Sequence, residues 1–126
     1  MYDFHGFLDV AETIETDPKL MSNESYRRTG ISRAYYASYK VSDEYLKVEY
    51  PSYSGIYGMS SHRALWEFFD KSKELKRLEI SNAGLRIFDL RKRADYNSRC
   101  TISKSDLKLA NREAKKIINK IHNVSC

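Results

Sequence analysis

An arginine and a carboxylate lie one helical turn apart near the end of an apolar run. The segment RKRADY covers residues 91–96, and helical spacing places Gly84, Phe88, Arg91 and Asp95 on one face. A guanidinium beside a carboxylate can serve catalysis or bind a partner. The same pair can also be an ordinary helix-end ion pair worth a few tenths of a kcal/mol, and the residue pattern alone favours that interpretation.

Basic residues and tyrosines suggest what such a face could bind. The chain carries 22 Lys and Arg against 17 Asp and Glu, so its formal net charge is +5, and it contains 10 tyrosines. A basic excess raises the odds of a polyanionic ligand, and tyrosine can stack on bases. Scattered basic residues are more commonly a solvated surface, and tyrosines more commonly serve the core or a dimer interface.

Other catalytic and metal-binding patterns are missing from the sequence. It has no glycine-rich phosphate loop, no GxSxG motif and no HExxH pair. The histidines His5, His62 and His122 lie far apart in sequence, so neither a metal site nor a cofactor is predicted. Because His62 stands at the start of an expected helix, it is predicted to be a capping or packing residue.

The elements that must position these residues are helices. Alternating apolar patterns and Asn-Gly turns are absent, which predicts an all-α fold, a four- to five-helix up-and-down bundle with one domain over residues 1–126. The expected helices cover residues 4–16, 22 or 23 to 49, 60 or 61 onward, 82–96 with Ser81 as cap, and 103–121. Trp66, Phe69, Leu90 and Ile117 lie on apolar stripes and are predicted to be buried.

Composition and cysteine usage limit the class of protein. The hydrophobic content of 41% suits one globular domain, and no apolar run has the length of a membrane span. Cys100 and Cys126 offer no paired framework and no zinc spacing, and the N-terminus lacks the layout of a secretion signal. These features predict a cytoplasmic protein without a membrane partner.

Four motifs in order make the chain resemble the HEPN superfamily, in particular its small stand-alone prokaryotic proteins. They are ISRAYYA at 31–37, a helix beginning near His62 with aromatic residues, LRKRADY at 90–96, and an amphipathic stripe at 110–121. The resemblance implies a helical bundle that forms a homodimer, with the arginine-bearing helices facing each other across a cleft. It also implies a toxin–antitoxin or phage-defence system, paired with a minimal nucleotidyltransferase that in some pairs modifies a tyrosine comparable with Tyr96.

The sequence departs from the catalytic members of that family at one point. Their metal-independent ribonuclease site uses an arginine followed four to six residues later by a histidine, and no histidine follows Arg91 at that spacing. RNA cleavage needs groups that accept and donate protons near neutral pH, for which imidazole is well suited. A carboxylate paired with arginine is a poor proton acceptor, and arginine alone cannot relay protons. Ribonuclease activity is therefore the less favoured expectation.

Three functions remain in competition. The favoured hypothesis is binding of RNA or a nucleotide in the dimer cleft by Arg33, Tyr36, Arg91 and Arg93. The second is a ribonuclease in which Arg91, Asp95 and Tyr96 form the catalytic segment and His62 or His122 supplies the acid–base group. The third is a structural module for protein interaction. A histidine within hydrogen-bond reach of Arg91 would favour the enzyme, and its absence would favour binding.

Overall fold

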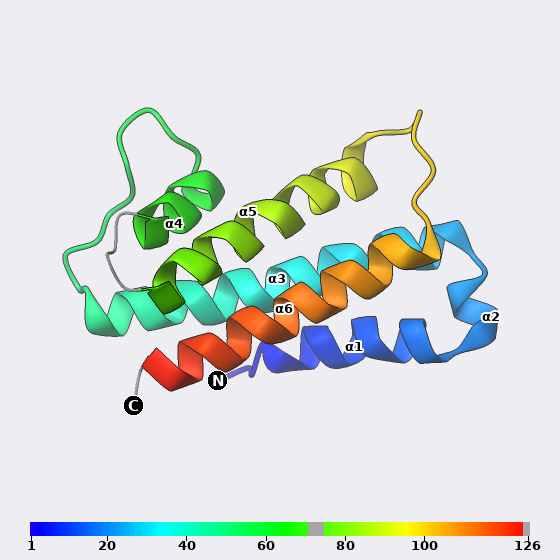
Figure 1. The fold of residues 1–126 in the computed structure, drawn as a ribbon, viewed down its shortest axis with the longest axis horizontal. Helices are drawn as coiled ribbons and strands as arrows, with labels where there is room; N and C mark the ends of the chain where they lie inside the picture. Colours follow the sequence, from blue (N-terminus) through cyan, green and yellow to red (C-terminus); the bar gives the residue numbers. More distant parts are fainter. Residues whose placement is uncertain (71–74, 125–126) are drawn as a thin grey trace.

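Four long helices lie side by side, and along the chain each runs in the opposite direction to the one before it (Figure 1). A computed structural model describes residues 1–70 and 75–124, with side chains for 1–70 and 77–123. The long helices are α1 (His5–Thr16), α3 (Glu24–Glu49), α5 (Leu75–Tyr96) and α6 (Lys104–Val124). Two short helices, α2 (Pro18–Met21) and α4 (Ser61–Asp70), complete the fold, and the described residues contain no strand.

The predicted all-α class is confirmed, but the predicted number of four to five helices is too low. The six helices found in the described ranges include the one-turn helix α2. Asp17 and Pro18 end α1 as predicted, and they also begin α2, because the Asp17 carboxylate accepts the backbone N–H groups of Lys19 and Leu20 and proline suits the first helical position. The Asp17–Pro18 pair therefore both ends α1 and begins α2.

The predicted start of α5 is wrong. The helix begins at Leu75, well before Asn82, and Ser81 is a buried residue inside it rather than its cap. Ile80 is fully buried beside Ser81, so core packing holds this early part of the helix in place. The predicted cap of α3 is confirmed at Asn23, whose side chain accepts the Ser25 N–H at 2.9 Å.

The start of α6 is a reciprocal capping box, as the Ser103 to Asp106 spacing predicts. The Ser103 hydroxyl accepts the Asp106 N–H at 3.1 Å, and the Asp106 carboxylate accepts the Ser103 N–H at 2.8 Å. This exchange satisfies two backbone donors that a helix start would leave unpaired. It fixes the point at which the chain turns from the connection after α5 into α6.

The predicted core residues Trp66, Phe69, Leu90 and Ile117 are all buried. Trp66 packs directly on the backbone of α5 at Gly84, where an added Cβ would lie only 2.2 Å from the ring. A side chain at position 84 would push α4 away, so glycine permits this close approach. The contact sets the position of α4 and therefore of His62, which stands in its first turn.

No helix among residues 1–70 and 75–124 is long and apolar enough to cross a membrane.

Candidate functional site

Arg91 lies in a frame of polar and aromatic side chains between α3 and α5. Its Nε donates to the Asp95 carboxylate at 2.9 Å, which confirms the ion pair suggested by the spacing. One terminal nitrogen donates to the Tyr36 hydroxyl at 3.1 Å and, at 3.5 Å, to the Tyr96 hydroxyl. The Arg91 side chain is 12% exposed. The residue is thus more deeply set than an ordinary helix-end ion pair would be.

Tyr36 connects two arginines that come from different helices. The central guanidinium carbons of Arg33 and Arg91 each lie 5.3 Å from the centroid of its ring, within cation–π range. Arg33 also lies over the Phe7 ring at 4.7 Å, and it has no carboxylate partner among the residues with described side chains. Only Asp95 balances the two cations in this cluster, so the cluster carries a net positive charge. We call Arg33, Tyr36, Arg91, Asp95 and Tyr96 the Arg91 centre.

A histidine from α4 lies next to this centre. The Tyr35 hydroxyl lies 2.8 Å from His62 Nδ1 and accepts the indole N–H of Trp66 at 3.2 Å. Burial raises the pKa of Tyr35, so its hydroxyl keeps its proton and donates it to Nδ1. Neutral His62 consequently carries its own proton on Nε2. The His62 ring also stacks on Tyr39, with 4.2 Å between ring centroids.

The electrostatic state of His62 is set by burial and by Arg91. Burial lowers the pKa of His62, and the positive charge of Arg91 lowers it further, so the ring is neutral at pH 7. The residue is a packing residue, as predicted, while the helix start is capped by Ser60, whose hydroxyl accepts the Arg63 N–H at 3.2 Å. No hydrogen bond joins His62 to Arg91 in the described part of the chain, and His122 pairs with His5 instead.

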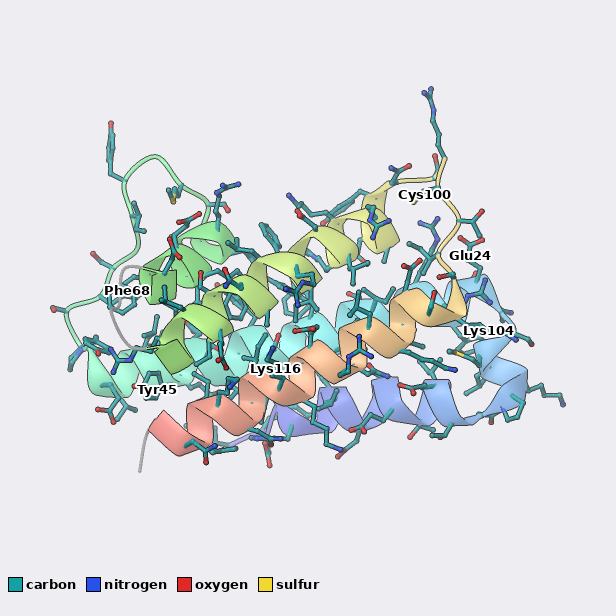
Figure 2. The ribbon with its side chains drawn as sticks, in the orientation of Figure 1. Glu24, Tyr45, Phe68, Cys100, Lys104 and Lys116 are labelled. Atoms are coloured by element: carbon teal, nitrogen blue, oxygen red, sulfur yellow. The ribbon has the colours of Figure 1, made fainter. Side chains whose placement is uncertain are left out.

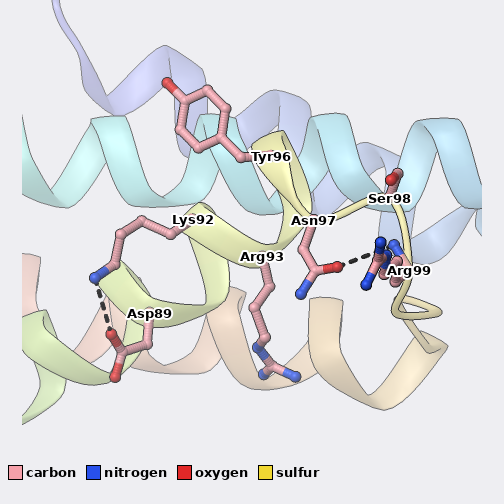
Figure 3. Close-up of a pocket in the computed structure, with 7 residues that line it drawn as sticks. All are labelled: Asp89, Lys92, Arg93, Tyr96, Asn97, Ser98 and Arg99. Carbon is pink, nitrogen blue, oxygen red and sulfur yellow. Dashed lines mark hydrogen bonds and ion pairs between the residues drawn. The ribbon is translucent and has the colours of Figure 1, made fainter.

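Arg93 does not join the Arg91 centre, although the sequence analysis grouped it there. Two residues along a helix turn the side chain by about 200°, so Arg93 lies on another side of α5. Figure 3 shows Arg93 and Tyr96 pointing in different directions around a hollow at the end of α5. The hollow is lined by the polar and basic residues Asp89, Lys92, Arg93, Tyr96, Asn97, Ser98 and Arg99. Tyr96 is the one predicted site residue that reaches both the hollow and the Arg91 centre.

Sequence reasoning missed the arginine that fixes the end of α5. Arg28, on α3, donates to four backbone carbonyls, those of Arg93, Ala94, Asn97 and Cys100. It also pairs with Glu24 at 3.1 Å, and Glu24 in turn accepts the Ile102 N–H at 2.9 Å. Glu24 and Cys100 lie at the same end of the molecule (Figure 2). We call Arg28 and Glu24 with these backbone partners the Arg28 clamp.

The Arg28 clamp positions the connection between α5 and α6. The last carbonyls of a helix have no partner within the helix, and Arg28 supplies donors to them. The pKa of Glu24 is lowered, first by the hydrogen bond from the Ile102 N–H and then by Arg28, so the carboxylate is ionised at neutral pH. No motif in the sequence separates Arg28 from its neighbour Arg27, which also donates to backbone carbonyls, those of Ile102 and Met21.

Within residues 1–70 and 77–123, no three His, Cys, Asp or Glu side chains are placed so that they could together hold a metal ion.

No protein-family model, curated protein or solved structure matches this chain.

Proposed function

We propose that this chain is a HEPN-type helical protein that binds RNA or a nucleotide at the Arg91 centre of a homodimer. The observation that carries the proposal is the convergence of Arg33 and Arg91 on the ring of Tyr36, with Asp95 as the one carboxylate of the cluster. Arginine suits phosphate because its planar guanidinium donates two parallel hydrogen bonds. The two arginines together offer more positive charge than the centre itself neutralises.

The aromatic residues supply the second half of the proposed recognition. Tyr96 is 73% exposed, so its ring is accessible to a base, while its hydroxyl lies 3.5 Å from Arg91. Stacking of a base on an aromatic side chain contributes about 1–3 kcal/mol and tolerates every base. A phosphate on the arginines and a base on Tyr96 would bind an unpaired nucleotide without a requirement for sequence.

The wider setting of the proposal rests on the family resemblance. It includes the homodimer, the nucleotidyltransferase partner, a role in a toxin–antitoxin or phage-defence system, modification of Tyr96 and a cytoplasmic location. Dimer formation is the part that is easiest to check. Light scattering should give twice the mass of one chain at micromolar concentration, and a persistent monomer would remove the cleft from the proposal.

The binding proposal is tested with a short fluorescent single-stranded RNA and anisotropy titrations. Arg33→Ala and Arg91→Ala should each weaken binding by about 5- to 150-fold, because each removes a charge-assisted contact of about 1–3 kcal/mol. Arg112→Ala is the matched control, since Arg112 is an exposed arginine on α6, outside the Arg91 centre. An equal loss in all three variants would indicate nonspecific attraction to a basic surface, and the Arg91 centre would then not be the site.

A second candidate function, metal-independent RNA cleavage, is favoured by one specific observation. The fold brings His62 close enough to Arg91 for the arginine to lower its pKa, although no histidine follows Arg91 in sequence. Neutral His62 carries its proton on Nε2, so it could protonate the leaving 5′-oxygen while water accepts the 2′-hydroxyl proton and an arginine stabilises the charged phosphorus centre. Purified protein should then cut total RNA or transfer RNA in the presence of chelator, and His62→Gln should stop it. If the RNA stays intact on a denaturing gel, cleavage is ruled out and RNA binding remains the proposed function.

A further inference from the structure

Two histidines from opposite ends of the chain meet outside the Arg91 centre. His5 opens α1, and His122 lies in the last turn of α6. Their Nε2 atoms are 3.1 Å apart, and the two rings are nearly parallel, with an angle of 9° between their planes. Figure 1 shows that the N-terminus lies beside the end of α6. The contact joins residues 117 positions apart in sequence, which is why sequence spacing did not indicate it.

Asp3 orients the His5 ring. Its carboxylate lies 2.6 Å from His5 Nδ1 and accepts the backbone N–H of His5 at 3.0 Å. A carboxylate at this distance accepts the Nδ1 proton of His5 and holds the ring with Nε2 facing away from Asp3. Metal-binding histidines are commonly held this way, with one ring nitrogen donating to a carboxylate and the other facing the metal. His5 is therefore oriented as a metal ligand would be.

The surroundings of the two histidines favour a cation. His5 and His122 line a hollow together with the carboxylate residues Asp3, Glu44 and Glu49. The C-terminal ends of α3 and α6 also lie here, since Glu49 is the last residue of α3 and His122 belongs to the last turn of α6. Helix C-termini carry a partial negative charge. The hollow is thus an acidic location in a chain whose net charge is +5.

We propose that His5 and His122 bind one divalent first-row transition metal ion, such as Zn²⁺, through their Nε2 atoms. Imidazole nitrogens suit zinc, copper and nickel rather than magnesium or calcium. The two Nε2 atoms now make a direct hydrogen-bond contact at 3.1 Å. A tetrahedral ion with bonds of about 2.1 Å holds two nitrogens roughly 3.4 Å apart, so an ion would replace this contact and separate the nitrogens only slightly.

The site is an open one. No group of three His, Cys, Asp or Glu among residues 1–70 and 77–123 is placed to hold the ion, so water would fill its remaining positions. Asp3, Glu44 and Glu49 line the same hollow. A bound ion would tie the start of α1 to the end of α6. This proposal does not depend on RNA binding, because its residues are distinct from those of the Arg91 centre.

The test is calorimetric titration of the untagged, chelator-treated protein with ZnCl₂. Wild type should bind one Zn²⁺ per chain, and His5→Ala and His122→Ala should each weaken binding at least tenfold. Asp3→Asn should weaken it about tenfold, since it removes the carboxylate behind His5. His62→Ala is the matched control, because it deletes the remaining histidine and should change the affinity less than twofold.

Two further measurements separate this site from other zinc-binding groups. A Cys100→Ser/Cys126→Ser double variant should keep wild-type affinity, which excludes thiolate binding. Zn²⁺ should raise the melting temperature of wild type but not of His122→Ala, because the ion binds the folded state through residues from two helices. The proposal is overturned if either single histidine variant retains wild-type affinity, or if zinc binding is lost with the cysteines.

Discussion

Two arginines reach between α3 and α5, and they differ in what they bind. Arg28 donates to four backbone carbonyls at the end of α5 and to one carboxylate. Arg91 donates only to side-chain oxygens, those of Asp95, Tyr36 and Tyr96. A backbone carbonyl cannot leave its donor unless the chain moves, whereas a side-chain oxygen can rotate away. Arg28 is therefore committed to the fold, and Arg91 is able to exchange partners.

Exposure alone would rank these two arginines in the wrong order. The Arg91 side chain is 12% exposed and that of Arg28 is 22% exposed, so Arg91 is the more buried of the two. The class of partner is the better guide to function, because an anion can replace Asp95 at Arg91 but cannot replace four carbonyls at Arg28.

The largest effect is expected when the Arg28 clamp is removed. Arg28→Ala leaves the carbonyls of Arg93, Ala94, Asn97 and Cys100 without their donor and leaves Glu24 without its cation. We expect the free energy of unfolding to fall by about 3 kcal/mol, because charged hydrogen bonds to partly buried groups are lost together. Urea unfolding followed by circular dichroism measures this loss.

Arg28→Lys is the control for charge. Lysine keeps the positive charge but loses the planar fork that reaches several acceptors, so it should recover less than half of the lost stability. RNA affinity of the folded Arg28→Lys protein should stay near that of wild type. If Arg28→Lys has the unfolding free energy of wild type but does not bind RNA, Arg28 belongs to the binding surface together with Arg91.

Arg91→Ala should reverse the pattern seen for Arg28. We expect RNA or nucleotide binding to weaken by about 1–3 kcal/mol, with a smaller loss of stability, because the remaining partners of Arg91 can turn toward water. Arg91→Lys should rescue binding only in part, since the bidentate contact is lost. Asp95→Ala removes the other half of the ion pair. If both alanine variants lose stability equally and neither changes binding, Arg91 is an intrahelical anchor only.

Tyr36→Phe is expected to have a smaller effect. The substitution keeps the ring beside Arg33 and Arg91 but removes the hydroxyl that accepts from Arg91 at 3.1 Å. We expect RNA binding to weaken by about 1 kcal/mol, because Arg91 loses one of the contacts that orient it. Tyr39→Phe is the matched control on the same helix. Equal losses in the two variants would contradict the special role of Tyr36.

Local sequence rules predicted much of the fold and, within the site, the pairing of Arg91 with Asp95. The caps at Asn23 and Ser103, the burial of Leu90 and Trp66, and the Arg91 to Asp95 pair all follow from spacings of a few residues. Helical periodicity and capping are local properties, so the sequence carries them directly. The contact between Arg91 and Tyr36 needed knowledge of how α3 packs against α5.

Several contacts that sequence reasoning missed depend on long-range packing. Ser81 has the residue type of a cap, yet it lies inside α5 because the surrounding helix is buried in the core. Arg28 meets acceptors that lie more than 60 positions later in the chain, and His62 reaches the Arg91 centre through the contact of Trp66 with Gly84. Arg93 was placed with Arg91 by proximity in sequence, although helix geometry turns it to another side.

The smallest predicted effect is a change in the pKa of His62. It distinguishes Arg91 from Arg93, which lie on different sides of α5. Burial is the main cause of the lowered pKa of His62, and Arg91 is the second cause. Arg91→Ala should therefore raise the pKa of His62 toward its ordinary value of about 6.5, but not fully, since burial remains. Arg93→Ala removes the same charge from the other side of the helix and should leave this pKa unchanged. NMR titration of the ring protons measures both variants.

The same shift has a defined consequence for stability against pH. Because the pKa of His62 is lower in the folded state, the unfolded chain binds more protons as the pH falls through about 6.5. The contribution of His62 to stability is thus complete above that pH and is lost below it. Wild type should lose more stability between pH 7.5 and pH 5.5 than His62→Gln does, since other titrating groups are common to both. An identical loss in the two proteins would show that His62 titrates as it does in water and is not part of the Arg91 environment.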